Sequence, residues 1–196
     1  MRGQFRSGEK FLLRQMSEQF GISATPMREA LLRLVGEKAL TMDARGTVIT
    51  PTLSLEQLLE IRTLRVYLEG LGAAEAAKKA SDAEITELEE IHKKIFQCHL
   101  AANFKAAIHL NTEFHLRLCQ MAKMTTLYEI VESLWVRCGP ILSHLYDDGL
   151  PDWEPHPHLN VIAGLKQRDP ELASSAIRLD IEHGGQGLLK HVEGAM

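Results

Sequence analysis

The sequence predicts a mostly α-helical protein in two parts. A short winged helix-turn-helix is expected over residues 1–52, and an antiparallel bundle of about six helices over residues 53–196. Two short helical segments joined by a three-residue break predict the first part, because this is the helix-turn-helix pattern. Apolar residues that recur at helical spacing from Ser54 onward predict the second. The net charge also changes between the two parts, from +3 over residues 1–50 to −7 over residues 51–196.

The helix-turn-helix is expected over residues 11–37. Leu12, Met16 and Phe20 form one apolar stripe on the helix 11–20. Gly21 can take the left-handed conformation that closes this helix, and Ser23 is a good N-cap for the next one, over 23–37. With only two helices to cover them, we expect part of the apolar residues available for a core in residues 1–52 to stay in water. These residues are Phe5, Phe11, Leu12, Met16, Phe20, Ile22, Leu31, Leu34 and Val48.

A β-hairpin is expected directly after these helices. The β-rich segments 40–42 and 47–49 flank the turn 43–46, and Pro51 ends the module. The larger part then predicts helices at the following ranges: 54–79, 82–100, 103–122, 125–147, 157–168 and 170–191. Pro151, Pro155 and Pro157 separate the fourth helix from the fifth, and Asp169-Pro170 separates the fifth from the sixth.

The composition favours a cytoplasmic globular protein. No apolar run approaches the roughly 20 residues of a membrane helix, so no membrane partner is expected, and the N-terminus is too polar for a signal peptide. The three cysteines, Cys98, Cys119 and Cys138, are odd in number and include no CxxC pair, so we expect buried thiols rather than disulfides or a zinc knuckle.

Polar residues interrupt the apolar stripes of five predicted body helices. Burying such groups without partners is costly, so they are expected to meet one another, a metal or a ligand. Asn111 and His115 lie four residues apart on one helix face. With His158 and Asp180 they offer two imidazoles and two oxygens, which suits a divalent ion such as Zn, Ni, Mn or Fe. The alternative is that both histidines are hydrogen-bonded core residues.

Two arginines also interrupt these stripes. Arg65 and Arg137 could clamp the carboxylate of an anionic effector. The alternative is an interior salt bridge with Glu69, Glu113 or Asp180. The other histidines, namely His92, His99, His109, His156 and His191, are expected to be structural or exposed.

The segment FGISATPMREALLRL, residues 20–34, resembles the recognition helix of the GntR family of bacterial repressors, and EKAL with RGTVIT resembles that family's wing. The body resembles the FadR-type effector domain, called FCD. The similar pieces are Arg65–Glu69, Asn111–His115, His158 seven residues before Leu165, and Asp169-Pro170-Glu171.

The resemblance implies a homodimeric transcription regulator that binds a double-stranded DNA operator, with a small effector, an organic acid, bound in the body. It implies DNA contacts from Ser23, Thr25, Arg28, Arg45 and Gly46. It also implies a metal held by an Asp or Asn and three His, so that here Asn111 fills the Asp position and Asp180 the last His position. His183, one turn beyond Asp180, is a possible substitute. The expected effector site therefore comprises Arg65, Arg137, Asn111, His115, His158 and Asp180.

The chain departs from the family pattern in three places. Ala24 replaces an arginine beside the N-cap serine, and Lys38 replaces the usual glycine. The chain also begins where the family's second helix is about to start, so we expect a truncated head that is less stable than the body. Two other functions stay open: a metal-dependent enzyme on a helical bundle, and a truncated sensor that does not bind DNA. The sequence does not distinguish a repressor from an activator.

Overall fold

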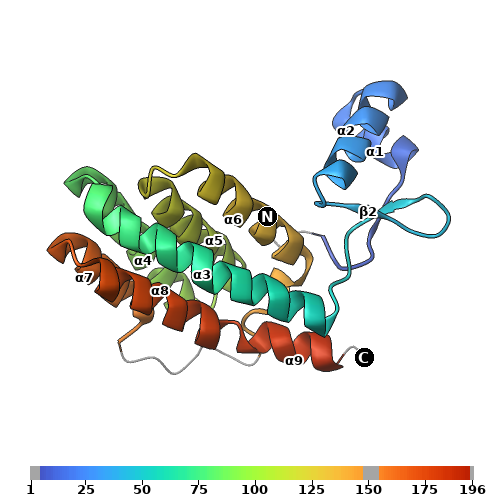
Figure 1. Cartoon of the computed structure of the whole chain (residues 1–196). Coiled ribbons are helices and arrows are strands. Elements are labelled where there is room, and N and C mark those ends of the chain that lie inside the picture. The colour runs from blue at the N-terminus through green and yellow to red at the C-terminus, as the bar shows by residue number, and fades with distance from the viewer. Residues whose placement is uncertain (1–4, 148–154, 195–196) are drawn as a thin grey trace.

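The computed structural model describes residues 5–147 and 155–194. Its N-terminal part holds two helices, α1 (Leu13–Phe20) and α2 (Ala24–Gly36), and three short strands, β1 (Lys10–Phe11), β2 (Thr41–Met42) and β3 (Val48–Ile49). The strands form one antiparallel sheet in the order β1-β3-β2. This head stands apart from the helical bundle and is joined to it by the segment between β3 and α3 (Figure 1). The predicted winged helix-turn-helix is confirmed.

The turn between α1 and α2 follows the predicted chemistry. Gly21 ends α1 in the left-handed conformation, with φ +65°, and Ser23 occupies the N-cap of α2. The first helix begins at Leu13 and not at residue 11, because Lys10 and Phe11 pair with β3. Lys38, where the family usually has glycine, also has a left-handed φ of +62°.

The head buries a small apolar core made of Phe11, Met16, Met27, Leu31, Leu40 and Val48. As expected, part of the apolar set of the head remains in water, since five of its members are exposed: Phe5, Leu12, Phe20, Ile22 and Leu34. Helices α1 and α2 and the hairpin each pack one face against this core. No described element covers the opposite faces of α1 and α2.

The body is an all-helical bundle built around α3 (Leu55–Lys79) (Figure 1). The other helices are α4 (Asp82–Leu100), α5 (Phe104–Met121), α6 (Thr125–Cys138), α7 (Pro157–Gln167), α8 (Pro170–Gly184) and α9 (Gln186–Gly194). Helix α3 packs against α5, α6, α7 and α8. Capping boxes at Ser54 and Ser81 start α3 and α4, since each serine side chain accepts from the third backbone N–H of its helix.

Two predicted helices are shorter than expected. The helix predicted over 125–147 ends at Cys138 and continues as a 3₁₀ helix, η1 (Gly139–His144), because Pro140 has no N–H to donate to the preceding turn. The helix predicted over 170–191 ends at Gly184, and α9 follows as a separate helix after Gly185. Adjacent glycines disfavour a helix interior. Pro151 lies outside the described residues.

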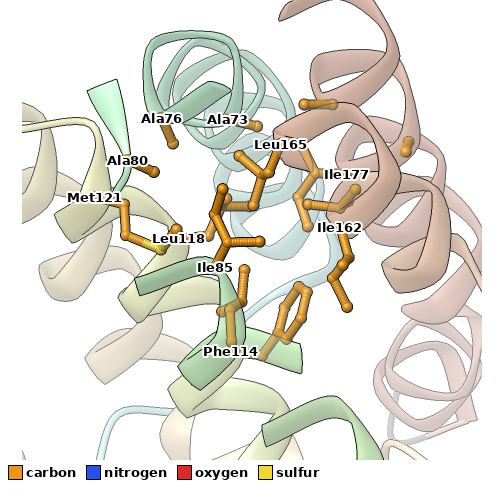
Figure 2. Close-up of a cluster of buried hydrophobic side chains, with 14 of the residues drawn as sticks. Ala73, Ala76, Ala80, Ile85, Phe114, Leu118, Met121, Ile162, Leu165 and Ile177 are labelled. Carbon is orange, nitrogen blue, oxygen red and sulfur yellow. The ribbon is translucent and has the colours of Figure 1, made fainter. Parts of the chain in front are cut away.

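The core of the body consists of two apolar clusters. One lies among α3, α4, α5, α7 and α8, and Figure 2 shows its side chains, including Phe114, Leu118, Leu165 and Ile177. The other lies among α3, α6, η1 and α9 and contains Trp135. Two of the three cysteines, Cys119 and Cys138, are buried and unpaired, as expected. None of the described helices is long and apolar enough to cross a membrane.

Candidate functional site

Three of the predicted metal ligands meet in the interior of the bundle. His115 on α5, His158 on α7 and Asp180 on α8 are all buried, and one ligand atom from each lies within 4.8 Å of the other two. Nε2 of His115 lies 3.0 Å from Oδ2 of Asp180, and Nε2 of His158 lies 3.5 Å from Oδ1 of the same carboxylate. Asp180 therefore faces both imidazoles.

A second carboxylate, Glu69 on α3, lies behind His115. Its Oε2 is 2.6 Å from Nδ1 of His115. Its Oε1 accepts from Nε of Arg65 at 2.6 Å and from the indole N–H of Trp135 at 3.1 Å. The guanidinium of Arg65 lies 3.7 Å from the ring centre of Trp135, which is cation–π geometry. Glu69 thus connects the predicted effector clamp to the predicted metal ligand.

Several nitrogen atoms at the centre of this cluster have no hydrogen bond among the described residues. Nε2 of His115 and both ring nitrogens of His158 are buried without one. The oxygens of Asp180 lie 3.0 Å from the first of these rings and 3.5 Å from the second. Buried polar atoms are normally satisfied, so these need another partner. Two imidazole nitrogens and a carboxylate oxygen are suitable ligands for a first-row divalent ion, so the donor set fits a metal.

The charges of the cluster are mutually stabilising. Burial alone would raise the pKa of Asp180, but His158 and His115 hold it well below its usual value. Burial would also raise the pKa of Glu69, but Arg65 and His115 lower it, so both carboxylates are ionised. Burial would lower the pKa of His115, but Glu69 and Asp180 raise it. His158 differs, because burial lowers its pKa more than Asp180 raises it.

The other predicted site residues of the body lie less centrally. Asn111 is half-buried one turn before His115, and none of its described contacts reaches the cluster. Arg137 is half-buried on α6 and likewise makes no described contact with it. The apolar stripe on which the sequence places Arg137 is buried at Leu134 and Ile141 but exposed at Ile130. His183, the alternative to Asp180, is exposed.

Arg65 forms the interior salt bridge that the sequence analysis gave as the alternative to an effector clamp. It is buried and paired with Glu69. This pairing does not remove it from the site, because Arg65 also lines a mostly apolar cavity with Leu58, Ile61 and Leu188.

Sequence reasoning missed Glu69 as a site residue and also missed two histidines. His92 on α4 is buried and His156 at the start of α7 is half-buried, and both lie beside His158. A signal for His92 was present, since it continues the apolar stripe Ile85, Leu88, Ile95 of its helix. The criterion that selected His115, a polar residue on an otherwise apolar helix stripe, therefore also selects His92.

The head presents all five predicted DNA-binding residues on its surface. Ser23, Thr25 and Arg28 are exposed at the N-terminal end of α2. The side chain of Ser23 makes no capping bond, so its hydroxyl remains able to donate to a phosphate. Asp43 shapes the wing by accepting from the backbone N–H groups of Arg45 and Thr47, at 2.9 and 2.8 Å. This turn places Arg45 and Gly46 at its exposed tip.

The arginines of the head also differ in their partners. Arg14 pairs with Glu18 and Arg33 with Glu37, each in an i,i+4 ion pair. No such pair involves Arg28 within the described residues. Arg28 is therefore the arginine of α2 that is best placed to meet DNA, since the start of a recognition helix faces the major groove.

Comparison with known proteins agrees with this arrangement. Residues 1–49 match the model of bacterial regulatory proteins of the gntR family, and residues 60–183 match the FCD domain. The chain is 34% identical to the HTH-type transcriptional regulator McbR of Escherichia coli, over 86% of this chain and 78% of that protein. It is 26% identical to the Nta operon transcriptional regulator of Aminobacter aminovorans, over 98% of this chain and 90% of that protein.

A solved structure shows the same fold. The structure of E. coli McbR/YncC superposes with a TM-score of 0.86 at 30% identity, covering 96% of this chain and 91% of that chain. The chain belongs to the GntR family of bacterial transcription regulators and carries an FCD domain. It is a DNA-binding regulator and not an enzyme.

Proposed function

We propose that this regulator binds its operator as a homodimer and that its FCD domain binds a small organic acid through a divalent metal. The observation that carries the proposal is the buried group of His115, His158 and Asp180, whose imidazole nitrogens lack hydrogen-bond partners. Asn111 is the proposed fourth ligand. When bound, the metal supplies positive charge that attracts the effector's carboxylate.

The residues of this chain prepare the site for that role. Glu69 accepts the Nδ1 proton of His115, which leaves the Nε2 lone pair directed toward Asp180. Arg65 reaches from Glu69 to the apolar cavity between α3, α8 and α9. In our proposal the guanidinium of Arg65 pairs with the carboxylate of the effector. Arg137, expected to share this task, stays a proposal that rests on the sequence.

Helix α3 links this site to the DNA-binding head. It carries Arg65 and Glu69. Only five residues, 50–54, separate its first residue, Leu55, from strand β3 of the wing. An effector that shifts Arg65 therefore displaces the helix that holds the wing. In our proposal this movement lowers operator affinity, so that the protein is a repressor relieved by its effector.

Metal analysis tests the proposal directly. The protein is reconstituted with Zn²⁺, Ni²⁺ or Mn²⁺, dialysed and measured by elemental analysis. We expect one equivalent of bound metal, and we expect His115→Ala to lose its Mn²⁺ and its metal-dependent thermal stability. If the wild-type protein binds none of the three ions, the metal is ruled out and the pocket is a purely organic site.

Operator binding and subunit number are tested separately. A gel-shift on the native promoter region should show a complex that weakens when metal and an organic acid are added together. A complex that strengthens instead would indicate an activator. Two recognition helices are needed to read a two-fold symmetric operator. Analytical ultracentrifugation at tens of micromolar should therefore give a dimer, and a monomer would contradict this part.

A further inference from the structure

A second group of histidines lies on the far side of His158. His92 on α4 and His156 at the N-cap of α7 each place one ring nitrogen within 4.8 Å of the others and of His158. The ring centres lie 5.3 Å apart for His92 and His156, 5.5 Å for His92 and His158, and 4.5 Å for His156 and His158. The rings come from two helices that are widely separated in the sequence.

Two of the three histidines, His92 and His158, have buried ring nitrogens without a hydrogen bond. Nδ1 of His92 is buried without a hydrogen-bond partner, as are both ring nitrogens of His158. Nδ1 of His156 accepts a 3.2 Å hydrogen bond from the backbone N–H of His158, which holds the two rings together. Since an unsatisfied buried nitrogen is costly, His92 and His158 need a further partner, and the nearby ring of His156 can bind the same one.

The partner must be small and must bind imidazole nitrogens. One ring nitrogen from each of the three histidines lies within 4.8 Å of the other two, which is close enough for all three to bind one ion. Uncharged imidazole is the form that binds metals. The short distances between the three nitrogens suit a single ion better than an organic molecule.

We propose that His92, His156 and His158 form a second metal position, distinct from that of His115, His158 and Asp180. Nε2 of His158 faces Asp180, and Nδ1 of the same ring is left for the second position. A neutral imidazole offers one lone pair, so the two positions are filled alternately. If His156 binds through Nε2, the ion displaces the 3.2 Å hydrogen bond, because the ring proton then occupies Nδ1. The proposal rests on the proposed metal site, since His158 belongs to both.

The two positions differ in the ions that they favour. The first includes a carboxylate, which suits Mn²⁺, whereas three imidazoles favour Cu²⁺ or Ni²⁺. Cu²⁺ binds nitrogen ligands most strongly of the divalent first-row ions. The second position should therefore take Cu²⁺ in preference, and His115→Ala should lose Mn²⁺ but keep Cu²⁺.

Copper binding to the metal-free full-length protein tests this. Equilibrium dialysis measures stoichiometry and affinity, and pulsed electron paramagnetic resonance counts the imidazoles bound to Cu²⁺. We expect one equivalent with three imidazoles. His92→Phe keeps a ring against Phe114 but removes the nitrogens, so it should lose one imidazole and weaken Cu²⁺ at least about tenfold. His109→Ala is the matched control, because His109 is exposed on α5, and it should bind like the wild type.

Thermal unfolding shows whether His92→Phe folds. Without metal the variant should melt at or above the wild-type temperature, because it loses an unsatisfied buried nitrogen. With Cu²⁺ at a fixed concentration, the wild type should gain more stability than the variant. Two bound imidazoles in the wild type, with no effect of His92→Phe, would overturn the second position and leave the first intact. Absence of bound Cu²⁺ in the wild type, or loss of Cu²⁺ binding in His115→Ala, would also overturn the second metal position. The first metal position is tested separately, by the Mn²⁺ content of the wild type.

Discussion

Glu69 illustrates how one buried carboxylate serves three neighbours. Arg65, His115 and Trp135 all direct a nitrogen at it, from three different helices. An isolated buried carboxylate would be strongly destabilising, but here its charge is shared with a guanidinium and an imidazole. The same contacts fix the tautomer of His115, which is the role that outer carboxylates play around metal-bound histidines.

Replacing this carboxylate tests that role. Glu69→Gln keeps the shape of the side chain but removes its charge, so Mn²⁺ affinity should fall by about 10- to 100-fold. The metal-free variant should also unfold more readily, by a few kcal/mol, roughly the cost of leaving a buried ion unpaired. Equilibrium dialysis and denaturant titration measure the two effects. Glu113→Gln, on the exposed side of α5, is the control. Unchanged Mn²⁺ affinity would restrict Glu69 to a structural role.

Arg28 carries the corresponding prediction in the head. Arg28→Ala should weaken operator binding by about 1–3 kcal/mol and relax specificity at one base pair if it reads a base. If it contacts a phosphate, binding to all sequences should weaken alike and the salt dependence should decrease. Gel-shift titrations at several salt concentrations separate these cases. Arg33→Ala removes an arginine already paired with Glu37 and should have little effect. Equal losses in both variants would argue against a specific contact.

Much of the candidate site could be predicted from the positions of polar residues on apolar stripes. His115, His158 and Asp180 were found in this way, because each lies on a helix whose buried side is regular. Arg137 is half-buried and stays a prediction from the sequence. The salt bridge of Glu69 with Arg65 was open to prediction from its i,i+4 spacing, but its contacts with His115 and Trp135 were not, because only the tertiary fold brings α5 and α6 near α3.

At the scale of whole elements, the sequence predicted which segments are helices better than where they end. Serines and asparagines marked most starts correctly, because capping is a local interaction. The ends at Cys138 and Gly184 were missed, although Pro140 and the pair Gly184-Gly185 are visible in the sequence. Strand β1 was missed because two residues carry no periodicity, and its pairing with β3 is a tertiary contact.

The start of α4 offers a test of one such local interaction. Glu84 completes the capping box with Ser81 and also pairs with Lys123, and these contacts, led by that with Lys123, lower its pKa to about 2. Because the folded pKa is below the unfolded value of 4.5, this stabilisation is present above about pH 4.5 and is lost as the pH falls toward 2.

Glu84→Gln should therefore lower the free energy of unfolding near pH 7 by about 1 kcal/mol, a discounted value because solvent screens the pair. The difference from the wild type should shrink as the pH falls and vanish near pH 2. Denaturant titrations at a series of pH values measure it. Glu90→Gln, which removes only an exposed pair with Lys93, should cost less. A difference that does not depend on pH would show that Glu84 acts through its hydrogen bonds and not through its charge.

At the scale of the whole molecule, the two parts differ in how much apolar surface they bury. The body has two extensive clusters, whereas the head has six buried apolar residues. On the head, Leu12 is 51% exposed and Phe20 is 62% exposed. Each exposed Å² forgoes about 25 cal/mol of stabilisation. A part of about 50 residues is already marginal, so the head depends on the bundle, a second subunit or DNA for additional support.

Hydrogen exchange measures this difference in the free protein. Amides of residues 13–36, in α1 and α2, should exchange much faster than those of residues 105–138 in α5 and α6, because local opening of the head exposes little additional apolar surface. Binding of operator DNA should slow exchange in α2 most, since that helix is expected to enter the groove. Helix α9, which contributes only Leu188 and Val192 to the buried core of the bundle, provides an internal reference. Equal protection in α2 and α5 without DNA would contradict this prediction. It would show that the small core of the head stabilises this part as well as the larger clusters stabilise the bundle, despite the exposure of Leu12 and Phe20.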